Sequence, residues 1–175
     1  MSIIKFLKTD FPDVFLVETN LFIDQRGELT KYFQSDLFDK LPFSVDDVYT
    51  TRSSRDVIRG MHHQISPYGQ MKLISCLAGA FYDIAVDLRF DSPTYNKIFS
   101  YELDSRKKIS ILIPAGFSHG TYSLDDNSIM LSICSGKYLP EYESGFNMHS
   151  LKLPFVSKKA ICSEKDKKLP SFIYK

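Results

Sequence analysis

Hydrophobic and polar residues alternate along several short stretches of the chain. Within Phe81–Arg89, every second side chain is apolar, while the set between them includes Asp83 and Asp87. This period of two predicts a β-strand with one apolar face and one partly polar face. Ile109–Ile113 alternates in the same way ahead of a Pro-Ala-Gly turn, and Ser128–Ser135 is a further short β-rich run. The pattern therefore predicts strands that recur at short spacing.

Helical patterns are almost absent. The stretch around Ser35–Lys40 is the one segment that favours a helix, and Asp24-Gln-Arg-Gly27 favours a turn. Short strands with little helix between them predict an all-β sandwich, jelly roll or barrel of antiparallel strands. No repeat or linker divides the sequence, so we expect residues 1–175 to form one domain. The Lys-rich segment Val156–Lys175 is expected to be a mobile tail or a closing flap.

Composition narrows the class of protein. The chain is 43% hydrophobic and 14% aromatic over 175 residues, which is enough for a sizeable core and argues against disorder. A net charge of +1 gives no field that would favour nucleic acid or an anionic membrane. Cys76, Cys134 and Cys162 are odd in number and widely spaced, which argues against a disulfide framework and fits a reducing compartment. With no secretory signal pattern or membrane-length apolar run, a cytoplasmic location is expected.

A group of potentially reactive residues lies in the middle of the chain. The run Arg59-Gly-Met-His62-His63-Gln64 precedes Lys72, and His119 follows in a later β-rich region. Adjacent strand residues point to opposite faces, so we expect only one of the two neighbouring histidines to serve a cavity. Asp83 and Asp87 are expected to support other side chains, for instance by pairing with an arginine. The ligand set is poor for a metal ion, because glutamines stand where carboxylates would be needed.

The motifs together resemble the dTDP-4-dehydrorhamnose 3,5-epimerase family, whose members act on nucleotide-linked 4-keto sugars. The resemblance runs in family order through most of residues 12 to 170, so it is specific although each motif alone is weak. It implies a cupin-type jelly roll, a homodimer in which an N-terminal strand completes the partner's sheet, and no metal or organic cofactor. The matching stretches are Asp24-Gln-Arg-Gly27, Arg59-Gly-Met-His62, Gln70-Met-Lys72, Asp83-Ile-Ala-Val-Asp-Leu-Arg89, Ser92-Pro-Thr94, Ile113-Pro-Ala-Gly-Phe-Ser-His-Gly120, Tyr138-Leu-Pro-Glu141 and Ser163-Glu-Lys-Asp166.

The resemblance implies roles for the residues of the sugar pocket. His62 matches a general base, Asp166 the carboxylate that orients it, and Lys72 the cation that stabilises an oxyanion at C4 of the sugar. These roles are chemically coherent, because a carbon next to a ketone loses a proton to form an enolate. Arg59 and His119 match positions that line the sugar pocket.

The resemblance also implies residues that bind the nucleotide. Arg26 matches a diphosphate contact, for which its planar guanidinium is suited. Phe22 and Tyr138 match positions that enclose the base or stack on it. Gln70 and Tyr49 are further expected substrate contacts.

One catalytic position departs from the family. The resemblance implies a tyrosine, acting as proton donor on the face opposite the histidine, at the position of Ser132. Because a serine hydroxyl is a far weaker acid than a phenol, it could only position a water or leave room for Tyr122, Tyr138 or another donor. We therefore expect inversion at a single centre, with C3 favoured. The alternatives are a 3,5-double epimerase with another donor, a 3,4-ketoisomerase and a non-catalytic sugar-nucleotide-binding protein.

Other departures bear on which nucleotide is bound. The family's Asn-x-Ser appears here as Tyr49-Thr-Thr51, and His63 replaces a residue that is usually aromatic. Leu29 and Lys31 also differ from residues that lie near the nucleotide in relatives. A GDP-, CDP- or UDP-linked sugar, including one larger than a hexose, is therefore as open as a thymidine-linked one.

Overall fold

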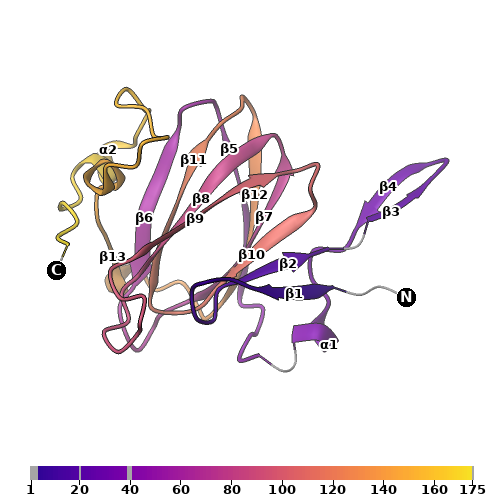
Figure 1. Cartoon of the computed structure of the whole chain (residues 1–175), viewed down its shortest axis with the longest axis horizontal. Coiled ribbons are helices and arrows are strands. Elements are labelled where there is room, and N and C mark those ends of the chain that lie inside the picture. The colour runs from indigo at the N-terminus through magenta and orange to yellow at the C-terminus, as the bar shows by residue number, and fades with distance from the viewer. Residues whose placement is uncertain (1–3, 20, 39–40, 175) are drawn as a thin grey trace.

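The protein is a sandwich of two antiparallel β-sheets. The computed structural model describes residues 4–19, 21–38 and 41–174, and Figure 1 shows the strands packed as two layers. One sheet has six strands in the order β1-β2-β10-β7-β12-β5. Their bounds are Lys5–Lys8, Phe15–Glu18, Ile109–Ile113, Met71–Ala78, Ser128–Ser135 and Asp47–Ser53, respectively. The all-β prediction is confirmed, and the strands predicted at 109–113 and 128–135 form with those bounds.

The second sheet has five strands in the order β13-β6-β11-β8-β9. Their bounds are Glu143–Gly145, Ile58–Gln64, Phe117–Ser123, Ala80–Asp87 and Ile98–Asp104, respectively. The predicted strand at 81–89 thus begins one residue earlier and ends at Asp87, where a turn follows. Because this order interleaves strands that are distant in sequence, residues from the middle and the end of the chain meet on one sheet.

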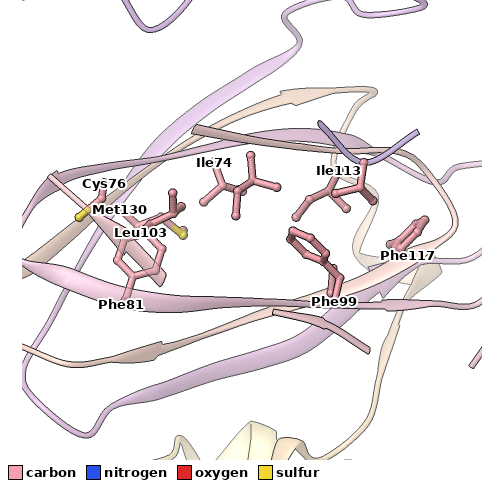
Figure 2. Packing of buried hydrophobic residues seen from close by; sticks show 11 residues of the cluster. Ile74, Cys76, Phe81, Phe99, Leu103, Ile113, Phe117 and Met130 are labelled. Atoms are coloured by element: carbon pink, nitrogen blue, oxygen red, sulfur yellow. The ribbon is translucent and has the colours of Figure 1, made fainter. Parts of the chain in front are cut away.

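The core between the sheets is apolar on one side only. Figure 2 shows its side chains converging from both layers, among them Ile74 and Met130 from the six-stranded sheet and Phe81 and Phe99 from the other. This cluster fills the side where β9 and β10 lie. The opposite side, between β5, β12, β6 and β11, carries polar inward-facing residues and remains open. Apolar packing therefore holds the two sheets together while leaving a cavity at the other edge.

The C-terminal segment packs on the outer face of the five-stranded sheet. Phe146, Leu151 and Phe172 contact a cluster that includes Ile84 and Val86 of β8. This segment contains the short helices η1 (Pro140–Tyr142), η2 (Met148–Leu151) and α2 (Glu164–Lys167). Its last part, the yellow region beside β6 in Figure 1, contains the stretch expected to form a mobile tail or a closing flap, and Val156, Ala160 and Phe172 of that stretch pack against the same cluster.

Two parts of the N-terminal region, one on each side of residues 21–30, cover the outer face of the six-stranded sheet. Phe6, Phe33 and Phe38 pack there on a cluster that includes Leu73. The helix α1 spans Ser35–Phe38, and the last two residues of the predicted helix lie outside the described part. No helix in the described ranges has the length and apolar character needed to cross a membrane.

A hairpin projects away from the sandwich, as Figure 1 shows. It consists of β3 (Leu21–Asp24) and β4 (Gly27–Thr30), joined by the turn predicted from the sequence. Phe22, Ile23 and Leu29 are exposed on it, with Ile23 at 73%. Isolated two-stranded hairpins have little stability of their own in water, so a second surface would be needed to cover these side chains.

Candidate active site

The open edge of the sandwich contains a cavity of about 420 Å³. It adjoins a second hollow of about 270 Å³, and Tyr49, His62 and Lys72 line both. β6 and β11 contribute one wall, β5, β7 and β12 contribute the other, and residues 161–166 of the C-terminal segment complete the first hollow. Of the predicted site residues, the larger cavity gathers Arg59, His62, Lys72, His119, Asp166 and Tyr49, and the smaller adds Gln70 and Tyr138.

His62 is paired with Asp166. Its Nε2 lies 2.8 Å from Oδ1 of the carboxylate, and Oδ2 accepts a hydrogen bond from the backbone nitrogen of Gly60 at 3.1 Å. Asp166 is 5% exposed, and Ser163 caps the helix that carries it by accepting from the Asp166 nitrogen. With Nε2 bonded to the carboxylate, Nδ1 is the imidazole nitrogen left to take a proton. A carboxylate in this position also stabilises the imidazolium that would form.

Gly60 allows β6 to approach β11 closely. Its φ is +102°, and a Cβ atom at this position would lie 2.7 Å from the carbonyl oxygen of His119. The pairing of the two strands shifts register between His119 and Thr121, opposite this glycine. The Arg-Gly-Met-His motif therefore needs glycine for steric reasons. The backbone nitrogen of this Gly60 also holds the Asp166 carboxylate that bonds to His62.

Lys72 reaches the cavity from the opposite sheet. It is the Cα partner of Cys134 on β12, and burial lowers the pKa of its ammonium group, against the effect of nearby acidic groups such as Asp83 and Glu143. None of the ion pairs formed within the described part of the chain includes Lys72. A weakly solvated cation without a bound carboxylate interacts strongly with a developing oxyanion.

His119 and Arg59 lie on the same wall as His62. His119 Nε2 is 2.7 Å from Oδ2 of the buried Asp83, whose Oδ1 has no hydrogen-bond partner among the described residues. Arg59 bonds through its guanidinium to Ser53 Oγ and the Arg52 carbonyl. Asp83 was expected to support another side chain, and the side chain that it bonds to is His119.

The smaller hollow contains Glu143, which was not among the predicted site residues. Tyr138 donates to Glu143 at 2.9 Å, and Lys165 donates to the same carboxylate at 2.6 Å. Gln70 donates to the Gly136 carbonyl at 2.8 Å. Glu143 is brought here by the pairing of β13 with β6, which sets Glu143 opposite Gln64. Since this pairing joins distant segments, no local pattern could have indicated Glu143, whereas Lys165, which lines the larger cavity, lies inside the matched Ser163-Glu-Lys-Asp166 stretch.

One expectation about neighbouring residues is wrong and another is confirmed. His63 lines the smaller hollow together with His62, so the prediction that only one histidine would serve a cavity is wrong. His63 follows His62 near the end of β6, and its Nδ1 lies 3.2 Å from Ser118 Oγ. Asp87 does pair with an arginine, but away from the cavity. Although burial acts to raise it, hydrogen bonds from Arg89, Ser92 and Thr94 lower the pKa of Asp87 to about 2.

The position of the missing tyrosine lies in the opposite wall. Ser132 is fully buried on β12, its Oγ lies 3.3 Å from Cys134 Sγ, and its Cα partner on β5 is Tyr49. Tyr122, considered as a replacement donor, belongs to the cluster on the outer face of the other sheet and bonds to Asp56. It therefore cannot reach the cavity in this fold.

Phe22 and Arg26 do not join the other site residues within one chain. They lie with Leu29 around a separate hollow on the β3–β4 hairpin. The Arg26 side chain bonds to Asp24 next to the turn. Within the described ranges, no group of three or more His, Cys, Asp or Glu side chains is arranged to hold a metal ion.

Comparison with known proteins identifies the family of this chain. A family model described as dTDP-4-dehydrorhamnose 3,5-epimerase matches residues 8–173. The dTDP-4-dehydrorhamnose 3,5-epimerase of Shigella flexneri is 32% identical over 167 residues, covering 91% of each chain. The crystal structure of the Bacillus anthracis enzyme, with TDP and PPi bound, is 33% identical, has a TM-score of 0.91 and covers 97% of this chain and 100% of that chain.

A further solved structure carries a sugar nucleotide. The dTDP-6-deoxy-D-glucose-3,5-epimerase of Legionella pneumophila, in complex with dTDP-4-keto-L-rhamnose, is 28% identical with a TM-score of 0.88. The match covers 98% of this chain and 100% of that chain. The motifs, the sandwich and the matched length agree, and the chain belongs to the dTDP-4-dehydrorhamnose 3,5-epimerase family of carbohydrate isomerases.

Proposed function

We propose that the protein epimerises a nucleotide-diphosphate-linked 4-keto-6-deoxy sugar, by removing and returning a proton next to the C4 ketone. The observation that carries the proposal is the pair His62–Asp166 on one wall of the cavity, with Lys72 on the other. A base, its orienting carboxylate and an oxyanion partner are the groups that enolate chemistry requires.

His62 is the base in this proposal. It takes the proton from the carbon next to the ketone, and Asp166 stabilises the resulting imidazolium. Lys72 stabilises the negative charge on the C4 oxygen, while Arg59 and His119 contact the sugar. We propose inversion at C3 alone, because the family's tyrosine is absent from the position of Ser132.

The smaller hollow is proposed to receive the nucleotide end of the substrate. Tyr138 is 49% exposed at its rim, where a ring can stack on a base. Arg26 and Phe22 lie on the projecting hairpin, away from this cavity. They would contact a diphosphate and base bound in the cavity of a second copy of the chain, so we propose the homodimer that the resemblance implies. The base itself is left open, so dTDP-, GDP-, CDP- and UDP-linked 4-keto sugars are all candidates.

Hydrogen exchange in deuterated water tests the proposal. Each of the four 4-keto-6-deoxy sugar nucleotides is incubated with the protein, and deuterium at C3 and C5 is followed by NMR. Exchange at C3 without exchange at C5 is expected with at least one of them. Absence of exchange at both carbons in all four would overturn the proposal, and movement of the ketone from C4 to C3 would identify a 3,4-ketoisomerase instead.

The same experiment addresses the non-catalytic alternative. A binding protein would retain the sugar nucleotide without exchange, and His62→Asn would leave its affinity unchanged. An epimerase would lose exchange in that variant while still binding. Measuring both affinity and exchange therefore separates the two functions.

A further inference from the structure

Inversion requires a proton donor on the face of the sugar opposite the base. His62 enters the cavity from β6 of the five-stranded sheet, and Tyr49 enters it from β5 of the six-stranded sheet. Both side chains line the larger cavity and the smaller hollow. We propose that Tyr49 is the catalytic acid that returns the proton on the face opposite His62. This inference rests on the proposed function and supplies its missing donor.

The backbone register aims Tyr49 at the cavity. Asp47, Tyr49, Thr51 and Ser53 each line a hollow between the sheets, so every second residue of β5 points inward. Tyr49 is 38% exposed and lines both hollows at the open edge of the sandwich, where the sugar would bind. Lys72 lines the same two hollows, so the phenol and the oxyanion partner act on one region.

Ser132 makes room for this phenol. It is the direct Cα partner of Tyr49 in the β5–β12 ladder, and its small side chain is fully buried. Partial burial raises the pKa of the Tyr49 phenol, while the neighbouring Ser132 hydroxyl acts to lower it. The net direction is upward, so the phenol carries its proton at neutral pH, as an acid must. The acidic group is thus on the strand next to the one that carries Ser132.

Other donors fit less well. Tyr138 donates its proton to Glu143 at the rim of the smaller hollow and does not line the larger cavity. Cys134 is buried and lines neither hollow. Lys72 has to keep its charge beside the C4 oxygen during the reaction.

The proton and electron balance needs no further reactant. His62 takes the proton from C3, and the C–H electron pair forms the C3–C4 double bond of the enolate beside Lys72. When the C4 ketone re-forms, C3 takes the Tyr49 proton on the other face. Tyr49 then regains a proton from water and the His62 imidazolium releases one, so the enzyme returns to its starting state.

The test compares exchange with inversion in Tyr49→Phe, using the sugar nucleotide on which the wild type shows C3 exchange. Because His62 remains, exchange at C3 with retention should persist near the wild-type rate. The rate of inversion should fall by about 10²- to 10⁴-fold, as expected for loss of a general acid. Phenylalanine keeps the ring, so the fold should be unaffected, and thermal unfolding checks this.

Two matched variants sharpen the result. Tyr122→Phe removes a phenol from the outer cluster and should leave both rates unchanged. Tyr138→Phe should weaken binding but keep the ratio of inversion to exchange. The proposal is overturned if folded Tyr49→Phe inverts C3 at the wild-type rate, if it loses exchange together with inversion, or if Tyr138→Phe alone separates the two. Failure of the proposed function is distinguishable, because the wild type would then show no exchange at all.

Discussion

The two walls of the cavity differ in how firmly they hold their groups. On the five-stranded sheet, His62 bonds to Asp166, and the same carboxylate bonds to the Gly60 backbone. His119 bonds to a buried aspartate on the same sheet. On the six-stranded sheet, none of the ion pairs within the described ranges includes Lys72, and Tyr49 lines the same cavity beside the small Ser132.

This difference separates two tasks. A base has to be held in one orientation and one tautomer, which the hydrogen bonds of the first wall provide. An oxyanion partner has to meet charge that develops during the reaction, so its own charge should not be neutralised beforehand by a bound carboxylate. Because the two walls belong to different sheets, a substitution in the second wall should leave the hydrogen bonds of His62 in place.

The largest effect is expected from removing the base. His62→Asn keeps a polar side chain but cannot accept the proton, so exchange at C3 should fall by about 10²- to 10⁴-fold. Deuterium incorporation measured by NMR checks this. The matched control is His149→Asn, which changes an exposed histidine outside the cavity and should leave exchange intact. Exchange that survives His62→Asn would place the base elsewhere.

A slightly smaller effect is expected on the opposite wall. Lys72→Ala removes the partner of the C4 oxygen, and loss of such a group typically costs about 3 to 4 kcal/mol in barrier height. The turnover rate should therefore fall by about 10²- to 10³-fold with little change in substrate affinity. Lys97→Ala, at an exposed position, is the control. A rise in KM without loss of turnover would instead make Lys72 a binding residue.

The orienting carboxylate should matter less than either. Asp166→Asn keeps the size of the side chain but removes a charge-assisted hydrogen bond worth about 1.5 to 3 kcal/mol. Exchange should slow by about 10- to 150-fold. Glu164→Gln lies on the same helix, where its side chain is 79% exposed, and should have no effect. Equal rates in both variants would remove Asp166 from the mechanism.

The sequence predicted these two walls to different extents. Alternation alone indicated an all-β fold, because period-two patterns are local. The residues of the base wall were then identified from motifs, and their geometry agrees with the expected pairing of His62 with Asp166. The role of Tyr49 was not foreseen beyond substrate contact, since only the pairing of β5 with β12 sets it beside Ser132.

Other misses have the same physical origin. Glu143 enters the smaller hollow through the pairing of β13 with β6, which no short pattern encodes. Phe22 and Arg26 matched a binding motif, but they lie on a projecting hairpin, so their role depends on contacts outside one chain. A motif specifies which side chain is present, whereas the sheet topology specifies what it faces.

The pH dependence gives a smaller test of the second wall. Because burial lowers the pKa of Lys72, its ammonium loses its charge at a lower pH than a free lysine would. The turnover rate should therefore decline as pH rises through that lowered value, below the usual lysine pKa of about 10.4. The free energy of unfolding should rise as pH increases from the lowered pKa of Lys72 in the folded protein to its usual value in the unfolded chain. In that interval the unfolded chain holds the proton and the folded protein does not, so removing the proton favours the folded state.

Lys72→Arg checks this assignment. Arginine keeps its charge throughout the accessible range, so the alkaline decline should move to higher pH even if the maximal rate is lower. The measurement is a pH profile of C3 exchange for both proteins. An identical alkaline limb in the two profiles would assign that limb to another group.

The smallest effect is expected from the serine that replaces the family's tyrosine. Ser132→Ala removes a hydroxyl beside the Tyr49 phenol, and a single neutral hydrogen bond contributes about 0.5 to 1.5 kcal/mol. Inversion should thus slow by about two- to tenfold at most, with exchange unchanged, because Tyr49 remains to supply the proton. The measurement is the ratio of inverted to exchanged product in Ser132→Ala beside Tyr49→Phe. A loss of inversion in Ser132→Ala as large as in Tyr49→Phe would mean that Ser132, through a bound water, is the donor. The acid of the second wall would then lie on β12 rather than on β5.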